Sequence, residues 1–234
     1  MLQMNALLSS LSLAERFEMN FLKSNRWMQL LNGLEVTLLV SVIAVMIGIV
    51  LGVLFALLRL SKCKPLSALA GLYIDVIRGT PMVVQLMIFY FVLLGPTTSL
   101  NKTTIGALAF GCNSGAYVAE IVRAGIQSID GGQREAGRSL GLTEWMTMKK
   151  IILPQAFKNV LPALANEFIT LLKETSVSGY IGLMDLTKAG DIIRSRTFAA
   201  FFPLIAVALI YLVIVVALSA GVTKLERRLR NGAR

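Results

Sequence analysis

The sequence predicts an all-α integral membrane protein with five transmembrane helices and a cytoplasmic helix–Gly–helix loop. Hydrophobic residues make up 56% of the 234 residues, charged residues make up only 15%, and the mean hydropathy is +0.72. Soluble domains average about 45–50% apolar and about 25% charged residues, so this composition indicates a membrane protein. The chain also contains several apolar stretches near the roughly 20 residues that a helix needs to cross a bilayer.

Residue types that the chain lacks exclude several kinds of chemistry. There is no histidine, and the two cysteines, Cys63 and Cys112, stand alone. A zinc site and Ser-His-Asp or Cys-His catalysis are therefore not expected, and we predict no catalytic residue, no metal and no cofactor bound by this chain. The net charge of +10 would suggest nucleic acid in a soluble protein, but in a membrane protein it is typical of cytoplasmic loops.

The N-terminal 30 residues are amphipathic and of mixed charge. Their first basic residue is Arg16, whereas a secretory signal begins with a basic region, so we expect a short interfacial helix. The transmembrane domain is then expected at 31–226, followed by a basic cytoplasmic tail at 227–234.

Two of the expected spans are uncharged over more than 20 residues, and three are interrupted by polar residues. The second is broken at Pro81, the third ends beyond Glu120, and the fourth contains Pro162 and Glu167. Such interruptions are tolerated in membranes where neighbouring helices satisfy the freed backbone groups. We therefore predict spans at about 34–59, 66–95, 103–126, 153–177 and 198–222.

The distribution of Lys and Arg predicts that the N-terminus is outside and the C-terminus is cytoplasmic. With this orientation most of the 23 basic residues lie in or beside cytoplasmic segments, as the positive-inside rule requires. The basic residues left outside are Arg16, Lys23, Arg26, Lys102, Lys188, Arg194 and Arg196.

The long loop at 128–152 reads as two short helices joined by a glycine. Asp130 is suited to cap the first helix, with Gln133 three residues later as in a capping box. Gly141 then follows two helical turns and is suited to a left-handed stop. The first half of the loop is thus predicted to be a helix over 133–140.

The second half of the loop is predicted to be another helix, capped by Thr143 and ending at Leu153-Pro154. Small residues at Ala136 and Gly137 are expected to allow the close approach of another protein surface. The whole loop is therefore interpreted as a docking knob between two membrane spans.

This loop resembles the EAA motif of ABC-importer permeases, in which Glu-Ala-Ala is followed after three residues by Gly and, after nine more, by Ile-x-Leu-Pro. One position departs, because Gly137 stands where a second Ala is usual. Segments at 33–38, 73–81, 114–123 and 172–176 resemble the branch that carries polar amino acids such as histidine, glutamine and arginine. The motif places ATPase coupling at Glu135, Ala136, Gly137, Ser139, Leu140, Gly141, Ile151, Leu153 and Pro154.

The resemblance implies a type I importer permease in a bacterial cytoplasmic membrane. Two permease subunits, identical or different, would form the pathway, and an extracytoplasmic binding protein would deliver the substrate. The chain has no GxxxxGK[ST] sequence, so ATP and Mg are expected on separate ATPase subunits that drive alternating access.

Polar residues within the spans are candidates for the substrate pathway, because a charge in mid-membrane costs about 2.5–3.5 kcal/mol and usually faces a cavity or a partner. At 1.5 Å per residue, several of them fall at a similar depth. The structural alternative is that Asp75 with Arg78, and Glu120 with Arg123, neutralise each other. The candidates are Gln85, Asn113, Ser114, Tyr117, Glu120, Asn166 and Glu167.

Two other functions are compatible with an apolar, multi-span chain. An ion-coupled secondary transporter would use Glu120 and Glu167 as ion sites, but such folds carry internal repeats, which this sequence does not show. A membrane scaffold would not need acidic residues at mid-depth. The ion-coupled transporter also does not explain the loop at 128–152.

Overall fold

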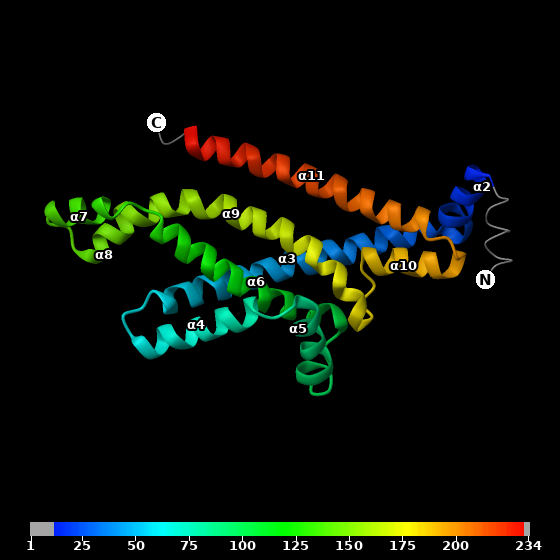
Figure 1. The fold of residues 1–234 in the computed structure, drawn as a ribbon, viewed down its shortest axis with the longest axis horizontal. Helices are drawn as coiled ribbons and strands as arrows, with labels where there is room; N and C mark the ends of the chain where they lie inside the picture. Colours follow the sequence, from blue (N-terminus) through cyan, green and yellow to red (C-terminus); the bar gives the residue numbers. More distant parts are fainter. Residues whose placement is uncertain (1–11, 232–234) are drawn as a thin grey trace.

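The computed structural model describes residues 12–231, and each regular element in that range is a helix (Figure 1). The N-terminal part contains α2 Leu13–Phe17, a π-helical turn Glu18–Leu22, a 3-10 turn Lys23–Asn25, α3 Arg26–Arg59, α4 Lys64–Arg78, α5 Met82–Ile88 and the π-helical η3 Phe89–Leu94. The remainder contains α6 Lys102–Gln127, α7 Gly131–Ser139, α8 Glu144–Thr147, the π-helical η4 Met148–Ile152, α9 Leu153–Glu174, the 3-10 helix η5 Thr175–Ile181, α10 Leu186–Thr197 and α11 Phe201–Asn231.

Helices α3 and α6 pack along each other at the centre of the fold. Gly48 of α3 faces Ser114 of α6, and one turn further on Gly52 faces Val118, where an added Cβ would overlap the Val118 side chain. In lipid there is little hydrophobic driving force for apolar helices to associate. Van der Waals packing where small residues let the two backbones approach closely therefore stabilises the contact. This contact fixes α6, which carries most of the candidate pathway residues.

Within residues 12–231, three helices are long and apolar enough to cross a membrane, namely those within Leu13–Arg59, Lys102–Gln127 and Phe201–Leu229, and a bent pair of helices can add a fourth span. Helix α9 has 22 residues and so is about 33 Å long, but it is more polar than these three helices. The all-helical class is confirmed, whereas the number of five spans stays a prediction.

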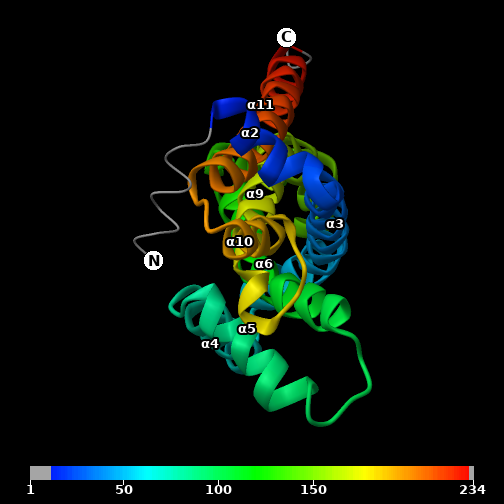
Figure 2. The ribbon, with the colours of Figure 1, turned by 90° about the vertical axis from the view of Figure 1, so that its right-hand side faces the viewer.

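The predicted second span is a bent pair of helices rather than one continuous helix. Helix α4 and the segment Met82–Leu94 meet at 107°. The bend lies at the break expected from the sequence: Gly79 ends α4 and Pro81 precedes α5 in an extended conformation. Proline cannot continue the hydrogen-bonding of a preceding helix, and it disfavours helical geometry in the residue before it. Figure 2 shows α4 and α5 projecting to one side of the other helices.

The first described residues turn away from α3. Ser24 and Asn25 have φ of 59° and 49°, and the chain changes direction there before α3 begins at Arg26. Residues 1–11 of the expected interfacial segment, and 232–234 of the expected tail, lie outside the described residues. Within the described part, the first long helix begins eight residues before the predicted start at 34.

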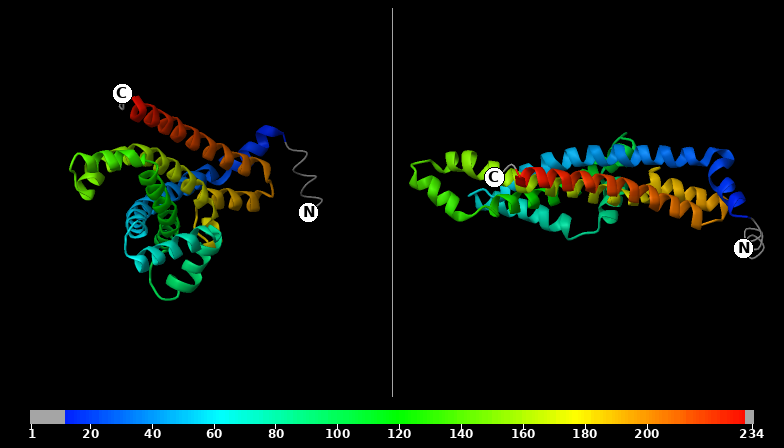
Figure 3. Two further views of the ribbon diagram at one scale, coloured as in Figure 1. Left: turned by 60° about the vertical axis from the view of Figure 1, so that its left-hand side comes forward. Right: turned by 90° about the horizontal axis from the view of Figure 1, so that it is seen from above.

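We call residues 128–152, which include α7 and α8, the elbow. The elbow lies at the same end of the molecule as the end of α11, whereas α2 and α10 lie at the other end (Figures 1 and 3). Helix α10, which the sequence analysis did not single out, packs on α3 and α11. A Cβ on Gly33 of α3 would lie 2.7 Å from the Asp185 carbonyl oxygen, so α10 begins directly against α3.

Candidate functional site

The elbow at 128–152 has the helix–Gly–helix form that the sequence predicts. Gly141 has φ of +80°, a conformation that glycine adopts without a steric penalty. Thr143 caps α8, where its hydroxyl accepts a hydrogen bond of 3.2 Å from the Met146 backbone N–H. Asp130 caps α7 by accepting a bond of 2.6 Å from the Gly132 backbone N–H. The order of caps and stop is therefore confirmed.

Two details of the elbow differ from the prediction. The cap at Asp130 does not include the reciprocal bond expected from Gln133. The helix that begins at Glu144 does not end at Leu153-Pro154 but continues through the π-helical turn η4 into α9. A wide turn can absorb a proline whose ring and missing N–H disrupt regular helical bonding, so the helix changes its pitch there instead of stopping.

Gly137 packs inside the elbow and does not face outward, so the expectation that it contacts a partner is wrong. A Cβ at Gly137 would lie 2.8 Å from Thr147 Cγ2 and 3.1 Å from Ile151 Cδ1. Gly137 thus lets α7 lie against the start of the next helix. The other coupling residues are distributed as follows: Ile151 is half-buried, and Glu135, Ala136, Ser139, Leu140, Gly141, Leu153 and Pro154 are exposed.

The exposed face of the elbow is partly apolar. Leu140 is 80% exposed and Trp145 is 67% exposed, although both are large hydrophobic residues in the part of the fold that projects farthest from the bundle (Figure 3). Lys149 lies 4.8 Å above the Trp145 ring and holds it by a cation–π contact. Trp145 was not predicted as a functional residue, although an aromatic residue two positions after the Thr143 cap in an exposed loop is a usable signal.

An ion pair ties the elbow to the loop between α3 and α4. Lys62 Nζ lies 3.0 Å from Glu144 Oε2, and this hydrogen bond is the main reason that the pKa of Glu144 is lowered. The two residues are 82 positions apart, so no local pattern in the sequence could have paired them.

Within the predicted membrane region, Gln85 joins the bend to α6. Its Nε2 donates to the Ile77 carbonyl at 2.7 Å and to the Thr80 hydroxyl at 2.7 Å. Its Oε1 accepts a bond of 3.0 Å from Asn113 Nδ2. Gln85 therefore satisfies backbone groups freed at the Pro81 break and fixes the bend against α6.

The next residue of α6, Ser114, reaches α9. Its hydroxyl donates a hydrogen bond of 3.1 Å to Glu167 Oε1. Asn113 and Ser114 are adjacent, so the amide pair with Gln85 and the hydroxyl–carboxylate pair lie at one level of the fold. We call Gln85, Asn113, Ser114 and Glu167 the membrane cluster. Among the described residues, Glu167 forms no ion pair.

The other predicted pathway residues lie around this cluster. Arg78 does not pair with Asp75, as one alternative expected, but lies 5.3 Å above the Tyr117 ring. As the last residue of α4, Arg78 can reach across to α6. Glu120 and Arg123 do form an ion pair. Asn166 is exposed and donates to the Pro162 carbonyl of its own helix, so the structure does not bring it into the cluster.

No group of three or more acidic, thiol or imidazole side chains within residues 12–231 is arranged to hold a metal ion. The arrangement offers hydrogen bonds, one carboxylate and one guanidinium instead. These groups can bind a small polar molecule reversibly.

Comparison with known proteins identifies similar chains. The family described as "binding-protein-dependent transport system inner membrane component" matches residues 48–231. A putative glutamine transport system permease protein of Rickettsia bellii is 42% identical over 203 residues, which are 86% of this chain and 92% of that protein. The arginine transport system permease protein ArtQ of Bacillus subtilis is 42% identical over 205 residues, 86% of this chain and 93% of that protein.

Solved structures show the same fold. A crystal structure of an amino acid ABC transporter with histidines contains a chain that is 46% identical, with a TM-score of 0.84 over 89% of this chain and 98% of the other. An inward-facing MetNI methionine ABC transporter matches with a TM-score of 0.72 at 20% identity, over 86% of this chain and 96% of the other, which shows a shared fold.

Proposed function

The chain belongs to the family of binding-protein-dependent transport system inner membrane components, and from this premise we propose that it imports polar amino acids by ATP-driven alternating access. It is the membrane permease subunit of an amino-acid importer. In the proposed cycle a separate ATPase binds and hydrolyses ATP with Mg, and this chain converts the ATPase's closure into movement of its helices.

The elbow is the proposed contact with the ATPase. Leu140 and Trp145 expose apolar surface at the tip of a projecting part of the chain, and an exposed apolar surface of this kind is suited to burial in a partner's groove. The close contact of Gly137 with Thr147 makes the elbow stiff. Since η4 continues directly into α9, a displacement of the elbow would pass to the helix that carries Glu167.

The membrane cluster is the proposed substrate pathway, and the Ser114–Glu167 hydrogen bond is the observation that carries this proposal. It holds an otherwise unpaired carboxylate at a fixed position inside the bundle. Such a carboxylate attracts an ammonium group, while Arg78 beside Tyr117 offers a cation for a carboxylate. Gln85 and Asn113 add amide hydrogen-bonding groups. Together these groups suit the two charged ends of an amino acid.

Further chains are needed to complete the transporter. The exposed amide of Asn166 and hydroxyl of Thr170 lie on α9, and polar groups facing lipid are costly. We propose that a second permease subunit, identical or homologous, covers this face, and that the pathway runs between the two. The N-terminus is proposed to be outside and the C-terminus cytoplasmic, with the binding protein docking at the outer end.

Reconstitution tests this function. The chain would be purified with an ATPase and a binding protein from the same organism and placed in proteoliposomes. We expect a stoichiometric ATPase in the complex, and uptake of glutamine, arginine or another polar amino acid that requires ATP and the binding protein. Uptake that instead collapses with ionophores and ignores ATP would favour the ion-coupled alternative and refute the proposal.

A further inference from the structure

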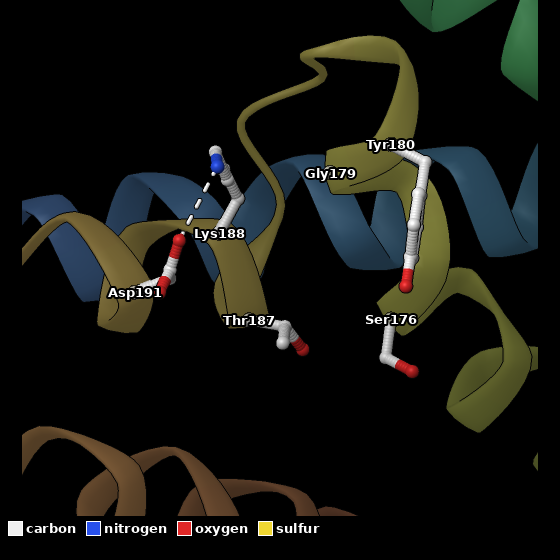
Figure 4. Close-up of a pocket in the computed structure, with 6 residues that line it drawn as sticks. All are labelled: Ser176, Gly179, Tyr180, Thr187, Lys188 and Asp191. Atoms are coloured by element: carbon white, nitrogen blue, oxygen red, sulfur yellow. Dashed lines mark hydrogen bonds and ion pairs between the residues drawn. The ribbon is translucent and has the colours of Figure 1, made fainter. Parts of the chain in front are cut away.

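A small pocket with hydroxyl and charged side chains among its lining residues lies between η5 and α10, at the end of the molecule opposite the elbow (Figure 1). Its volume is about 280 Å³, and it is lined by Ser176, Gly179, Tyr180, Thr187, Lys188 and Asp191. Figure 4 shows the hydroxyl groups of Ser176, Tyr180 and Thr187 facing the same space, with Lys188 and Asp191 joined beside it. None of these residues belongs to the membrane cluster or to the elbow.

We infer that this pocket accepts an acidic side chain of the extracytoplasmic binding protein, with Lys188 as the partner of the carboxylate; the inference rests on the proposed function and its orientation. Lys188 Nζ lies 3.3 Å from Asp191 Oδ2, which is a long contact for a charged pair. An ammonium group has three donors, so Lys188 retains donors for an incoming carboxylate.

Asp191 is already held by another residue. Its Oδ1 accepts bonds of 2.9 Å and 2.6 Å from Nε and Nη2 of Arg194. Arg194 is also the main reason that the pKa of Asp191 is lowered. Asp191 therefore stays ionised and paired when Lys188 turns to a ligand, and losing Lys188 should not leave an unpaired carboxylate.

The surroundings favour a negatively charged partner. Lys188, Arg194 and Arg196 lie on one short helix, where the half-buried Asp191 is the only carboxylate. The other acid near this helix, Asp185, is buried and used as the N-cap, accepting bonds from the Thr187 and Lys188 backbone N–H groups. Outer segments of membrane proteins usually carry few cations, so three on one outer helix are not explained by topology.

The exposed rim of the site favours a protein partner. Tyr180 is 66% exposed beside the pocket, and exposed tyrosines are among the residues that most often anchor protein interfaces. The alkyl stem of Lys188 lies on Gly179, where an added Cβ would be 3.2 Å from Lys188 Cδ, so the backbone of η5 helps to position the ammonium group.

The test measures the affinity of the binding protein for the complete transporter in nanodiscs. We expect Lys188→Glu to raise the Kd at least tenfold, and Tyr180→Ala to raise it severalfold. Lys188→Arg should keep most of the affinity. Lys23→Glu reverses the charge of an exposed lysine expected on the same side and should change the Kd less than twofold. ATPase activity without binding protein should equal that of the wild type in all four variants.

Other outcomes separate this inference from the proposed function. A Kd for Lys188→Glu within twofold of the wild type overturns the inference and leaves the function standing. The inference is also overturned if free amino acid alone stimulates the wild-type ATPase and Lys188→Glu abolishes this stimulation, because the pocket then binds a small molecule. If Lys188→Glu does not assemble, the Kd of Lys188→Gln is measured instead. We expect this Kd to rise about threefold, and an unchanged Kd would contradict the inference. A wild-type transporter that does not bind the binding protein at all refutes both.

Discussion

The elbow and the membrane cluster work by different physical means. The elbow is exposed and takes its shape from backbone geometry: a left-handed glycine at 141, a cap at Thr143 and a close contact at Gly137. The membrane cluster is largely buried and takes its shape from side-chain hydrogen bonds between three elements, such as that from Ser114 to Glu167. Changes of shape should therefore damage the elbow, whereas changes of charge should damage the cluster.

A reagent in solution should reach the two ends of the molecule from opposite sides of the membrane, and this is the largest difference that we expect between them. Single cysteines at Ser99 and Ser139, both exposed, would be introduced after Cys63 and Cys112 are replaced by serine. A membrane-impermeant maleimide added to intact cells should label the cysteine at 99 and spare the one at 139. Labelling of both from outside would contradict the proposed topology, and labelling in opened vesicles controls for reactivity.

Gly141→Val should abolish coupling without removing the protein from the membrane. A β-branched residue held in the left-handed region costs about 1–3 kcal/mol, so α7 and α8 should lose their relative orientation. We expect uptake and stimulated ATP hydrolysis both to fall more than tenfold in proteoliposomes.

The control for Gly141→Val is Gly131→Ala. Gly131 has ordinary helical geometry, and no atom lies within 4 Å of an added Cβ, so this variant should behave like the wild type. Normal coupling in Gly141→Val would show that the elbow does not depend on its left-handed glycine.

The two regions also differ in how far they could be predicted from the sequence. The caps of the elbow depend on contacts two or three residues apart, such as Thr143 with Met146, and these are visible in sequence, whereas the packing of Gly137 on Thr147 spans ten residues and was not expected. Depth counting placed Ser114 and Glu167 at one level, and the structure joins them. The pairing of Lys62 with Glu144 was not predictable, because it depends on how distant helices are placed.

The bend between α4 and α5 was only half predicted. The break at Pro81 was expected, but not its angle of 107°, which depends on the bonds that Gln85 makes to Ile77 and Thr80 after the chain has turned. The placement of Arg78 also depends on this bend. The sequence suggested that Arg78 pairs with Asp75 of the same helix, whereas the fold places it over the Tyr117 ring of α6.

Glu167→Gln should produce a smaller and more selective defect than Gly141→Val. A hydrogen bond to a charged group contributes about 1.5–3 kcal/mol, so a substrate that binds this carboxylate through a cationic side chain should lose roughly tenfold or more in uptake. Uptake of a neutral amino acid should fall less. The measurement is the ratio of arginine to glutamine uptake by one preparation.

Glu174→Gln is the matched control, since it removes a carboxylate two turns further along α9 and should leave the ratio unchanged. A lowered melting temperature of the Glu167→Gln complex with an unaltered ratio would instead assign Glu167 a structural role.

Gly137→Ala should have the smallest effect of the series. The added methyl group gains about 1 kcal/mol of helix propensity, but it lies 2.8 Å from Thr147 Cγ2, and such overpacking costs about 1–3 kcal/mol. We expect melting a few degrees lower and uptake within threefold of the wild type. Combining it with Thr147→Ala, which removes both the Cγ2 and the Oγ1 that would lie within 3.0 Å of the added Cβ, should restore most of the melting temperature; no recovery would show that this contact is not the cause.

The most direct test of the account compares Gly141→Val and Glu167→Gln in the same proteoliposomes, with ATP hydrolysis and amino-acid uptake measured together. We expect Gly141→Val to lose stimulated hydrolysis and uptake of all substrates in parallel. We expect Glu167→Gln to retain its basal hydrolysis and to shift its preference away from the cationic substrate. Two results would contradict this division of work between the elbow and the membrane cluster. One is a loss of basal hydrolysis in Glu167→Gln. The other is a change in Gly141→Val that affects the substrate preference alone.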